Sequence, residues 1–375
     1  MNKLKRYTFA MALMAVFSSQ ASAQKMVIGS YVFPKDNASY YGELAGGKPN
    51  GKGKTTFRNG DTYEGDYEKG KRQGRGIYIF SDTGEKYDGQ WFEDHQHGKG
   101  TFYFSNNNRY VGLWFKDYQE GEGTMYYYNG DKYVGNWKED KREGHGAYYW
   151  VNGITYDGEW LADRKHGKGL YDWRDGSSYY GDWAYDQRNG QGTYYYANGD
   201  KYEGAWKNDM MEGRGIYTFH NGDKYEGDYY NGQRTGQGIF TYADGRRYVG
   251  LFKNGVMCGH GVFTWPDGSV YDGSWQEDKQ NGFGKYTTKA GDTYEGNWVN
   301  GLMDGDNGIL RMKDGSKFKG SFKQGMKNGR GVEEAADGTR FEGNYQNDVR
   351  HGAFVEKDRN GKVIRKGSYN RGRLE

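Results

Sequence analysis

The chain has 375 residues, and its 53 Lys and Arg residues nearly balance its 50 Asp and Glu residues. Three of the basic residues lie in a short N-terminal segment, so the remainder is neutral, which argues against nucleic acid as a partner and gives no global attraction toward anionic membranes. The chain is rich in glycine and poor in aliphatic residues, as disordered chains are, but Phe, Trp and Tyr make up 18 % of it. The composition therefore predicts a folded protein whose core consists of rings.

The N-terminal segment 1–23 has the pattern of a secretory signal peptide. Lys3, Lys5 and Arg6 precede an apolar run over about 7–17, and Ala21-Ser-Ala23 forms a cleavage site of the A-x-A type. The run is shorter than the ~20 apolar residues that span a bilayer, although an uncleaved N-terminal anchor is the alternative. We expect a mature chain that starts near Gln24 and is exported to the periplasm, the cell surface or the medium.

One sequence unit recurs at a fixed interval along the rest of the chain. Its most constant part is Y-x-G, and a Trp or another large residue follows the first ring by four positions. From Tyr87 to Tyr294, successive first rings are separated by the same number of residues as Tyr110 and Tyr133. A degenerate fifteenth unit ends at Tyr369. Such self-similarity is the signature of a repeat protein. The fourteen Y-x-G rings are Tyr40, Tyr63, Tyr87, Tyr110, Tyr133, Tyr156, Tyr179, Tyr202, Tyr225, Tyr248, Tyr271, Tyr294, Phe318 and Phe341.

Each unit is predicted to form a β-hairpin. Tyr202, Gly204 and Trp206 lie at i, i+2 and i+4, which is one face of a strand. A second strand over 193–197 follows a G-x-G element, and Asn198-Gly199 then predicts a tight two-residue turn in which both residues take positive φ. The other connection, such as 138–143, is charged and is interpreted as a longer polar loop.

Stacked hairpins predict one continuous sheet. A lone hairpin is marginal in water, whereas neighbours in a repeat array share one sheet at roughly 10 Å per repeat. The expected fold is all-β, an elongated single-sheet array of antiparallel hairpins in which glycines leave room for neighbouring rings. The predicted segments are a signal peptide (1–23), an N-terminal cap (24–39), the repeat array (40–351) and a degenerate terminal repeat (352–375).

These motifs resemble the MORN repeat. One unit shows them in full: Tyr202-Glu-Gly204-Ala-Trp206, then Gly213-Arg-Gly215, then Asn221-Gly222. The resemblance covers about residues 40–369 and implies stacked hairpins in an elongated sheet. For function it implies membrane or phospholipid association, protein scaffolding or dimerisation, because different MORN arrays have different roles.

No motif predicts catalysis, a metal or a cofactor. The histidines, such as His97 and His166, are too far apart along the array to share a metal and are interpreted as solvated loop residues. The G-x-G elements precede strands, whereas a phosphate loop opens a helix, so they are interpreted as packing glycines. The single cysteine, Cys258, cannot form an internal disulfide. We therefore expect that the chain is not an enzyme.

Rings outside the Y-x-G-x-W element supply the candidate binding site. Three positions after the second glycine of G-x-G, several units carry Tyr where later units carry Thr; these rings are Tyr103, Tyr126, Tyr149 and Tyr195. They are expected on the face opposite the packed row, either as an exposed ladder for an extended ligand or as rings that stack across repeats. The structural repeat aromatics are expected to include Tyr110, Trp114, Tyr133, Trp137, Tyr156, Trp160, Tyr179, Trp183, Tyr202 and Trp206.

The leading functional hypothesis is an exported, non-catalytic repeat protein that presents a binding surface to a protein or a cell-envelope component. Phospholipid association is the alternative that the family resemblance implies, although the neutral mature chain lacks the basic cluster that anionic lipids attract. Glycan binding through the aromatic rows is the second alternative.

Overall fold

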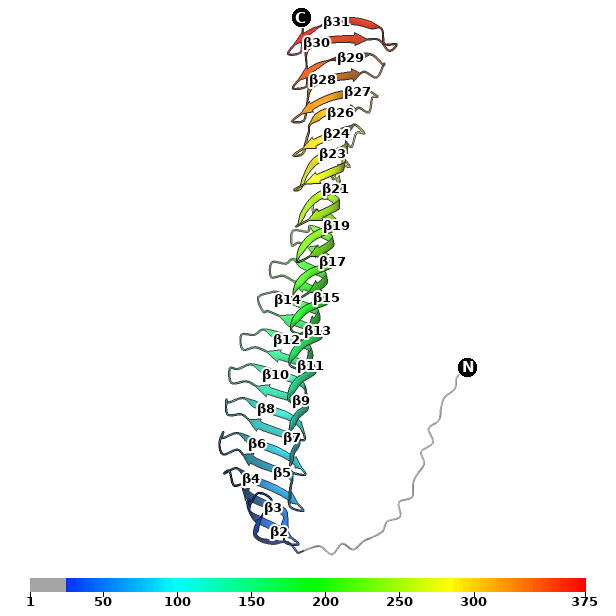
Figure 1. The fold of residues 1–375 in the computed structure, drawn as a ribbon. Helices are drawn as coiled ribbons and strands as arrows, with labels where there is room; N and C mark the ends of the chain where they lie inside the picture. The colour runs from blue at the N-terminus through cyan, green and yellow to red at the C-terminus, as the bar shows by residue number, and fades with distance from the viewer. Residues whose placement is uncertain (1–24) are drawn as a thin grey trace, which may run out of the picture. The chain divides into compact units, whose positions relative to one another are not determined.

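The computed structural model describes residues 25–375. The predicted signal peptide lies outside the described residues. These residues form two compact units, 25–128 and 129–375, and each consists of consecutive β-strands joined by turns (Figure 1). Within residues 25–375 there is no helix long and apolar enough to cross a membrane.

The first unit contains nine strands in chain order. They are β1 (Val27–Val32), β2 (Ser39–Ala45), β3 (Lys48–Thr56), β4 (Thr62–Glu68), β5 (Lys71–Ile79), β6 (Lys86–Phe92), β7 (His95–Tyr103), β8 (Arg109–Phe115) and β9 (Tyr118–Tyr126). Each pairs antiparallel with the next, from β1–β2 to β8–β9.

The second unit continues the same pattern. Its first strands are β10 (Lys132–Lys138), β11 (Lys141–Tyr149), β12 (Thr155–Leu161), β13 (Arg164–Asp172), β14 (Ser178–Ala184), β15 (Gln187–Tyr195), β16 (Lys201–Lys207), β17 (Met210–Thr218), β18 (Lys224–Tyr230), β19 (Gln233–Thr241) and β20 (Arg247–Lys253). They are followed by β21 (Val256–Thr264), β22 (Val270–Gln276), β23 (Lys279–Thr287), β24 (Thr293–Val299), β25 (Leu302–Met303), β26 (Gly305–Arg311), β27 (Lys317–Lys323), β28 (Met326–Glu334), β29 (Arg340–Gln346), β30 (Val349–Lys357), β31 (Val363–Asn370) and β32 (Arg373–Leu374).

Strand pairing confirms the predicted all-β array of antiparallel hairpins. In the hairpin β12–β13, Tyr156 lies opposite Tyr171 and Gly158 lies opposite Gly169. The same register recurs in β16–β17. In the hairpin that begins with β24, the partner strand is divided into β25 and β26, because the G-x-G element is interrupted there.

The rings of Y-x-G-x-W form the core on one face, which we call the aromatic face. Tyr156 is fully buried and Trp160 is nearly so, and their rings meet edge to face with centroids 5.2 Å apart. Tyr156 also contacts Trp183 of the next repeat at 5.6 Å. Since side chains alternate along a strand, the residues between these rings point to the opposite face. The core is therefore a single layer of rings that links each hairpin to the next.

Glycines make room for these rings, as the sequence predicts. A Cβ atom added to Gly169 would overlap the Tyr156 ring, and one added to Gly158 would overlap the backbone of Gly169. The Tyr156 hydroxyl reaches across the glycines and donates to the Glu159 carbonyl at 2.9 Å. Bare backbone under each ring is thus a requirement of the packing.

The Asn-Gly turn differs from its prediction. Residues 197–199 form a three-residue loop: the Gly199 N–H donates to the Tyr196 carbonyl, and the Tyr196 N–H donates to the Asp200 carbonyl. Only Gly199 within it has a positive φ, of 88°. This is a type I turn followed by a glycine in the left-handed region, the common three-residue hairpin loop. The predicted two-residue turn is therefore wrong.

The tight two-residue turn lies in the connection predicted to be a longer loop. Strands β10 and β11 are separated only by Glu139 and Asp140, which have φ values of 48° and 64°. Successive positive φ values define the type I′ turn that matches strand twist. In the next repeat, Asp163 of such a turn donates its N–H to the Arg142 carbonyl and accepts from the Arg142 N–H through its side chain. These bonds to the preceding repeat hold non-glycine residues in a strained conformation.

The ends of the described chain differ in chemistry. At the start, β1 pairs with β2 over its whole length and carries no charged residue. At the end, β31 contains Arg365 and Lys366, and only the short β32 pairs with its far end. Residue 352, where the degenerate terminal repeat is predicted to begin, lies within β30.

Candidate functional site

Two of the four predicted ladder tyrosines lie in the first unit. Tyr103 and Tyr126 stand at the ends of β7 and β9 on the face opposite the aromatic face, and both are exposed. The Lys86 ammonium lies 4.2 Å from the centroid of the Tyr103 ring, and the Arg109 guanidinium lies 4.5 Å from that of Tyr126. Each cation comes from the residue directly opposite in the same hairpin.

The other two ladder tyrosines lie in the second unit. Tyr149 ends β11 and is 41 % exposed, while Tyr195 ends β15 and is 49 % exposed. The Lys132 ammonium lies 4.6 Å from the Tyr149 ring centroid, and that of Lys201 lies 5.9 Å from Tyr195. Within each unit, the described residues show no ring contact between ladder tyrosines. Cations, rather than neighbouring tyrosines, cover these rings.

The ten structural aromatics are all buried on the aromatic face. In the second unit Trp160, Trp183 and Trp206 donate the indole N–H to a glycine carbonyl of the preceding repeat, as Trp160 does to Gly146 at 2.9 Å. A guanidinium caps several of these rings: Arg142 lies 4.2 Å from the Trp160 centroid and is held by Asp163 at 3.0 Å. These rings are therefore part of the scaffold and are not available to a ligand.

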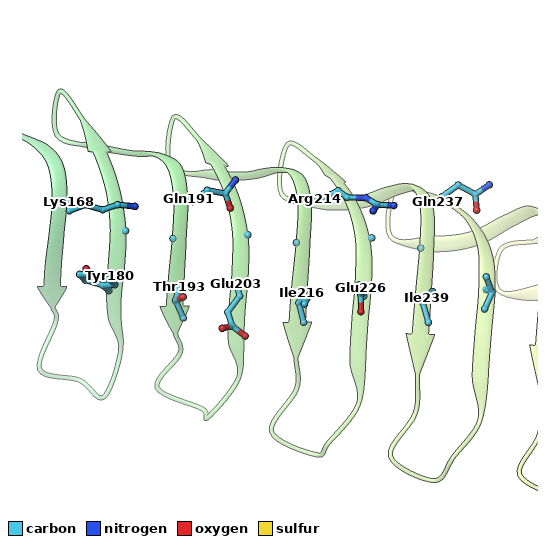
Figure 2. A pocket seen from close by; sticks show the side chains of 17 residues that line it. Lys168, Tyr180, Gln191, Thr193, Glu203, Arg214, Ile216, Glu226, Gln237 and Ile239 are labelled. Atoms are coloured by element: carbon cyan, nitrogen blue, oxygen red, sulfur yellow. The ribbon is translucent and has the colours of Figure 1, made fainter. Parts of the chain in front are cut away.

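The second unit contains an open groove of about 770 Å³ on the face opposite the aromatic face. It crosses the strands from β13 to β20, so that it passes over successive repeats (Figure 2). Its floor includes a line of glycines that face one another across neighbouring strands, such as Gly192 opposite Gly204 and Gly204 opposite Gly215. These glycines expose only backbone to the groove, because a Cβ atom added to Gly192 would point to the aromatic face and overlap the Tyr179 ring.

Two rows of side chains border the groove and recur once in each repeat. The first row comes from the middle of G-x-G and consists of Lys168, Gln191, Arg214 and Gln237 (Figure 2). The second row follows the second glycine and consists of Thr193, Ile216 and Ile239, with Tyr180, Glu203 and Glu226 from the neighbouring strands. One border therefore presents long polar side chains, and the other presents apolar side chains with interspersed carboxylates.

The long charged side chains of the first border have partners of opposite sign. Lys168 lies 2.7 Å from Asp182, and Arg214 lies 3.5 Å from Asp228. The Arg214 side chain is nevertheless largely exposed. These are surface pairs of small individual energy, so an incoming ligand can compete for them.

The carboxylates of the second border are also paired. Glu203 lies 2.7 Å from Lys201, and Glu226 lies 3.5 Å from Lys224. Because Lys201 also lies near the Tyr195 ring, the predicted ladder joins the groove at this point. Tyr195 and the groove residue Thr193 are two positions apart on β15 and share one face. The sequence predicts the tyrosine but not the groove beside it.

His97 and His166 are not solvated loop residues as predicted, although His95, His145, His220 and His260 are exposed. His97 lies in β7 between the rings of Phe92 and Phe115, at 5.5 and 5.3 Å, and His166 lies in β13. Their Nδ1 atoms are buried without a hydrogen-bond partner in the described part of the chain. Among residues 25–375, no group of three or more His, Cys, Asp or Glu side chains could hold a metal ion.

The fold defines a class of repeat protein in which each hairpin stacks its rings on the next. A family model, the MORN repeat, matches fourteen consecutive segments from residues 40–62 to 341–353. The chain belongs to the MORN repeat family. No curated protein matches it in sequence.

Three solved structures show slight likeness to the chain. The SAS-4 (dCPAP) TCP domain of Drosophila melanogaster, in complex with a proline-rich motif of Ana2, is 14 % identical over 41 % of this chain and 84 % of that one, with a TM-score of 0.28. The TCP10 domain of Danio rerio CPAP is 11 % identical over 91 % and 100 %, with a TM-score of 0.18. A catalytically inactive virginiamycin B lyase from Staphylococcus aureus is 9 % identical over 80 % and 100 %, with a TM-score of 0.13. Likenesses this slight support no argument.

Proposed function

We propose that this MORN repeat protein is an exported, non-catalytic scaffold that holds an extended segment of a partner protein or cell-envelope component in the groove of its second unit. The observation that carries the proposal is the recurrence of one chemical pattern along the groove. Each repeat supplies a long polar side chain, bare glycine backbone and an apolar or hydroxyl side chain in the same order. A ligand with a regular backbone could make equivalent contacts in successive repeats.

The spacing of the repeats suits an extended chain. Two strands per repeat place equivalent groove positions about 10 Å apart, and an extended polypeptide advances roughly 3.3 Å per residue. Three residues of such a ligand would therefore span one repeat. The polar border offers hydrogen-bond donors from Gln191, Arg214 and Gln237, while Ile216 and Ile239 offer apolar contact.

The charge distribution favours such a ligand over an anionic membrane. The four charged groove residues discussed above are each paired within 3.5 Å with a residue of opposite sign. Attraction to anionic lipid requires a cluster of unpaired Lys or Arg. A groove with balanced charge recognises its ligand through shape and hydrogen bonds.

Lysine substitutions in the groove test the proposal. Ile216→Lys and Ile239→Lys introduce long charged side chains into the apolar border, and both positions lie on an open face where lysine can be solvated. Val332→Lys is the matched control, because Val332 holds the equivalent position in β28 outside the groove. Proteins and glycans that copurify from an envelope fraction are identified for each variant, and the purified partner is then titrated.

The expected result is a loss of partner affinity of at least tenfold for the groove variants, with little change for the control. Equal binding by all three variants would place the partner elsewhere on the molecule and would contradict the proposal.

Liposome flotation tests phospholipid association, the alternative that family membership suggests. We expect no flotation with either neutral or anionic vesicles. Flotation with anionic vesicles that disappears at high salt would show charge-driven membrane binding, since salt screens such attraction. That result would replace the proposed scaffold function with membrane association.

A further inference from the structure

The first strand of the first unit leaves an apolar edge open. Strand β1, with the sequence VIGSYV, pairs with β2 on one side, and no other strand of the described chain pairs with it. Its Ile28 side chain is 72 % exposed and that of Val32 is 56 % exposed. An exposed strand edge carries unpaired N–H and C=O groups that serve as a template for another strand.

The last long strand of the second unit, β31, shows how an edge can be protected. β31 places Arg365 and Lys366 in the middle of the strand, and charge on an edge discourages pairing with another chain. β1 has neither a charged residue nor a proline within it. The protection used at one end of the described chain is therefore missing at the other.

The direction of the backbone groups on β1 follows from its hairpin with β2. The Phe33 N–H donates to the Ala38 carbonyl, which closes that hairpin. Because the hydrogen-bonding direction alternates along an antiparallel strand, Tyr31 and Gly29 also direct their backbone groups toward β2. Ile28, Ser30 and Val32 then direct theirs to the open edge.

One antiparallel register makes this edge complementary to itself. With Ser30 facing Ser30 of a second copy, Ile28 faces Val32, so the residues whose backbone groups point outward face one another. Each facing pair would exchange both of its N–H···O bonds. The two apolar side chains would meet on one face and cover each other.

The other face of the strand fits the same register. Tyr31 lies on the aromatic face, since it is opposite the buried Tyr40, and Gly29 lies on the same face two residues earlier. In the symmetric pair, Tyr31 of each copy faces Gly29 of the other. A ring over bare glycine backbone is the packing that this chain uses within its repeats.

We propose that β1 is a homodimerisation edge, at which two copies of this chain pair antiparallel about a two-fold axis through Ser30. The interface is isologous, so it closes at the dimer and does not propagate. The proposal does not depend on the groove of the second unit.

Cysteine crosslinking tests both the dimer and its register. In full chains that carry Cys258→Ser, Ser30→Cys places two thiols opposite each other at about 5.5 Å between Cα atoms, within the range that a disulfide spans. Ile28→Cys faces Val32 instead, so its thiols are too far apart to bond to each other. Mild oxidation should give a covalent dimer with Ser30→Cys and little or none with Ile28→Cys.

Sedimentation of the uncrosslinked protein provides an independent measurement. The dissociation constant of the dimer should rise at least tenfold for a chain with Ile28→Lys and Val32→Lys, because like charges then face each other. Ile28→Lys with Val32→Glu should recover most of the loss through opposite charges across the pair. Ile364→Lys is the matched control, since Ile364 is similarly exposed on β31, and it should sediment like the unmodified chain.

A chain that remains monomeric at all concentrations would overturn the proposal. So would crosslinking of Ile28→Cys equal to that of Ser30→Cys, or a dimer that the paired lysines leave intact.

Discussion

Gly261 and Tyr248 illustrate a contact that recurs along the array. A Cβ atom at Gly261 would overlap the Tyr248 ring, and Tyr248 is fully buried. The ring cannot move away, because it also contacts Phe252 at 5.2 Å and Trp275 at 5.3 Å. A single methyl group at this glycine therefore disturbs two neighbouring repeats.

Gly261→Ala is expected to lower the free energy of unfolding by about 1–3 kcal/mol, the usual cost of overpacking. Val262→Ala is the control, because Val262 points to the opposite face and is only half buried. Denaturant melts of both variants measure the difference. Equal stability of the two would show that the ring does not need the glycine.

The ladder tyrosines behave differently from the core rings. Tyr149 and Tyr195 are exposed and contact mainly the cations beside them, and later repeats carry Thr at the same position. Tyr149→Thr with Tyr195→Thr should therefore cost no more than about 1 kcal/mol for each ring, as for exposed cation–π pairs. A thermal melt checks this. A large fall in melting temperature would instead identify these tyrosines as packing elements.

At the scale of the strand and turn, two hairpin connections are distinguished by their backbone conformation. The turns at residues 139–140 and 162–163 place two non-glycine residues in the left-handed region, while the loop at 197–199 places only its glycine there. Ala162 has a φ of 47°, a conformation that costs an ordinary residue roughly 1 kcal/mol. Asparagine tolerates it better and stands at this position in several other repeats.

Ala162→Asn should therefore raise the free energy of unfolding by about 0.5 kcal/mol, part of the cost of that conformation. Ala197→Asn provides the comparison, since Ala197 lies in the three-residue loop and does not have a positive φ. Thermal melts of the two variants measure the change in stability that each substitution causes. Stabilisation by both, or by neither, would contradict the assignment of strain to the two-residue turn.

The sequence predicted the strands well because side-chain alternation is local. Tyr202, Gly204 and Trp206 share a face in any strand, and the ring-over-glycine contact follows from that register. The lengths of the two connections are predicted the wrong way round, because Asn-Gly fits either a two-residue or a three-residue loop. What decides between them is the bond from Asp163 to Arg142 of the preceding repeat, which no local pattern contains.

The groove could not be predicted for a related reason. Its glycine floor requires Gly192, Gly204 and Gly215 to lie at one level on three strands, which depends on the register both within and between hairpins. The partly buried environment of His97 could not be predicted either, since the rings of Phe92 and Phe115 that enclose it come from different hairpins.

At the scale of the whole molecule, buried carboxylates connect successive repeats and make stability depend on pH. Burial raises the pKa of the Asp200 carboxyl, but hydrogen bonds from the His220 N–H, the Tyr217 hydroxyl and the Asn198 amide outweigh it and lower the pKa to about 2. Asp131 has equivalent partners in an earlier repeat, and its pKa is also lowered.

An aspartate in an unfolded chain has a pKa of about 3.9. Since the folded pKa of Asp200 is lower, its contribution to stability is complete above about pH 4 and is lost as the pH falls toward 2. The melting temperature should therefore drop over this interval, and Asp200→Asn should make the drop shallower. Glu64→Gln, at an exposed position, is the control. A melting temperature that is constant between pH 5 and pH 2 would contradict this account.

Photocrosslinking in cells that express the chain tests whether the groove of the second unit holds an extended partner. A photoreactive residue replaces Ile216 in the groove, and the same residue replaces Val332 outside it. We expect one discrete set of adducts from position 216 and none from position 332. A third probe at Ile239 should crosslink to a neighbouring part of the same partner segment. Adducts from position 332 alone, or the same adducts from both, would contradict the proposal.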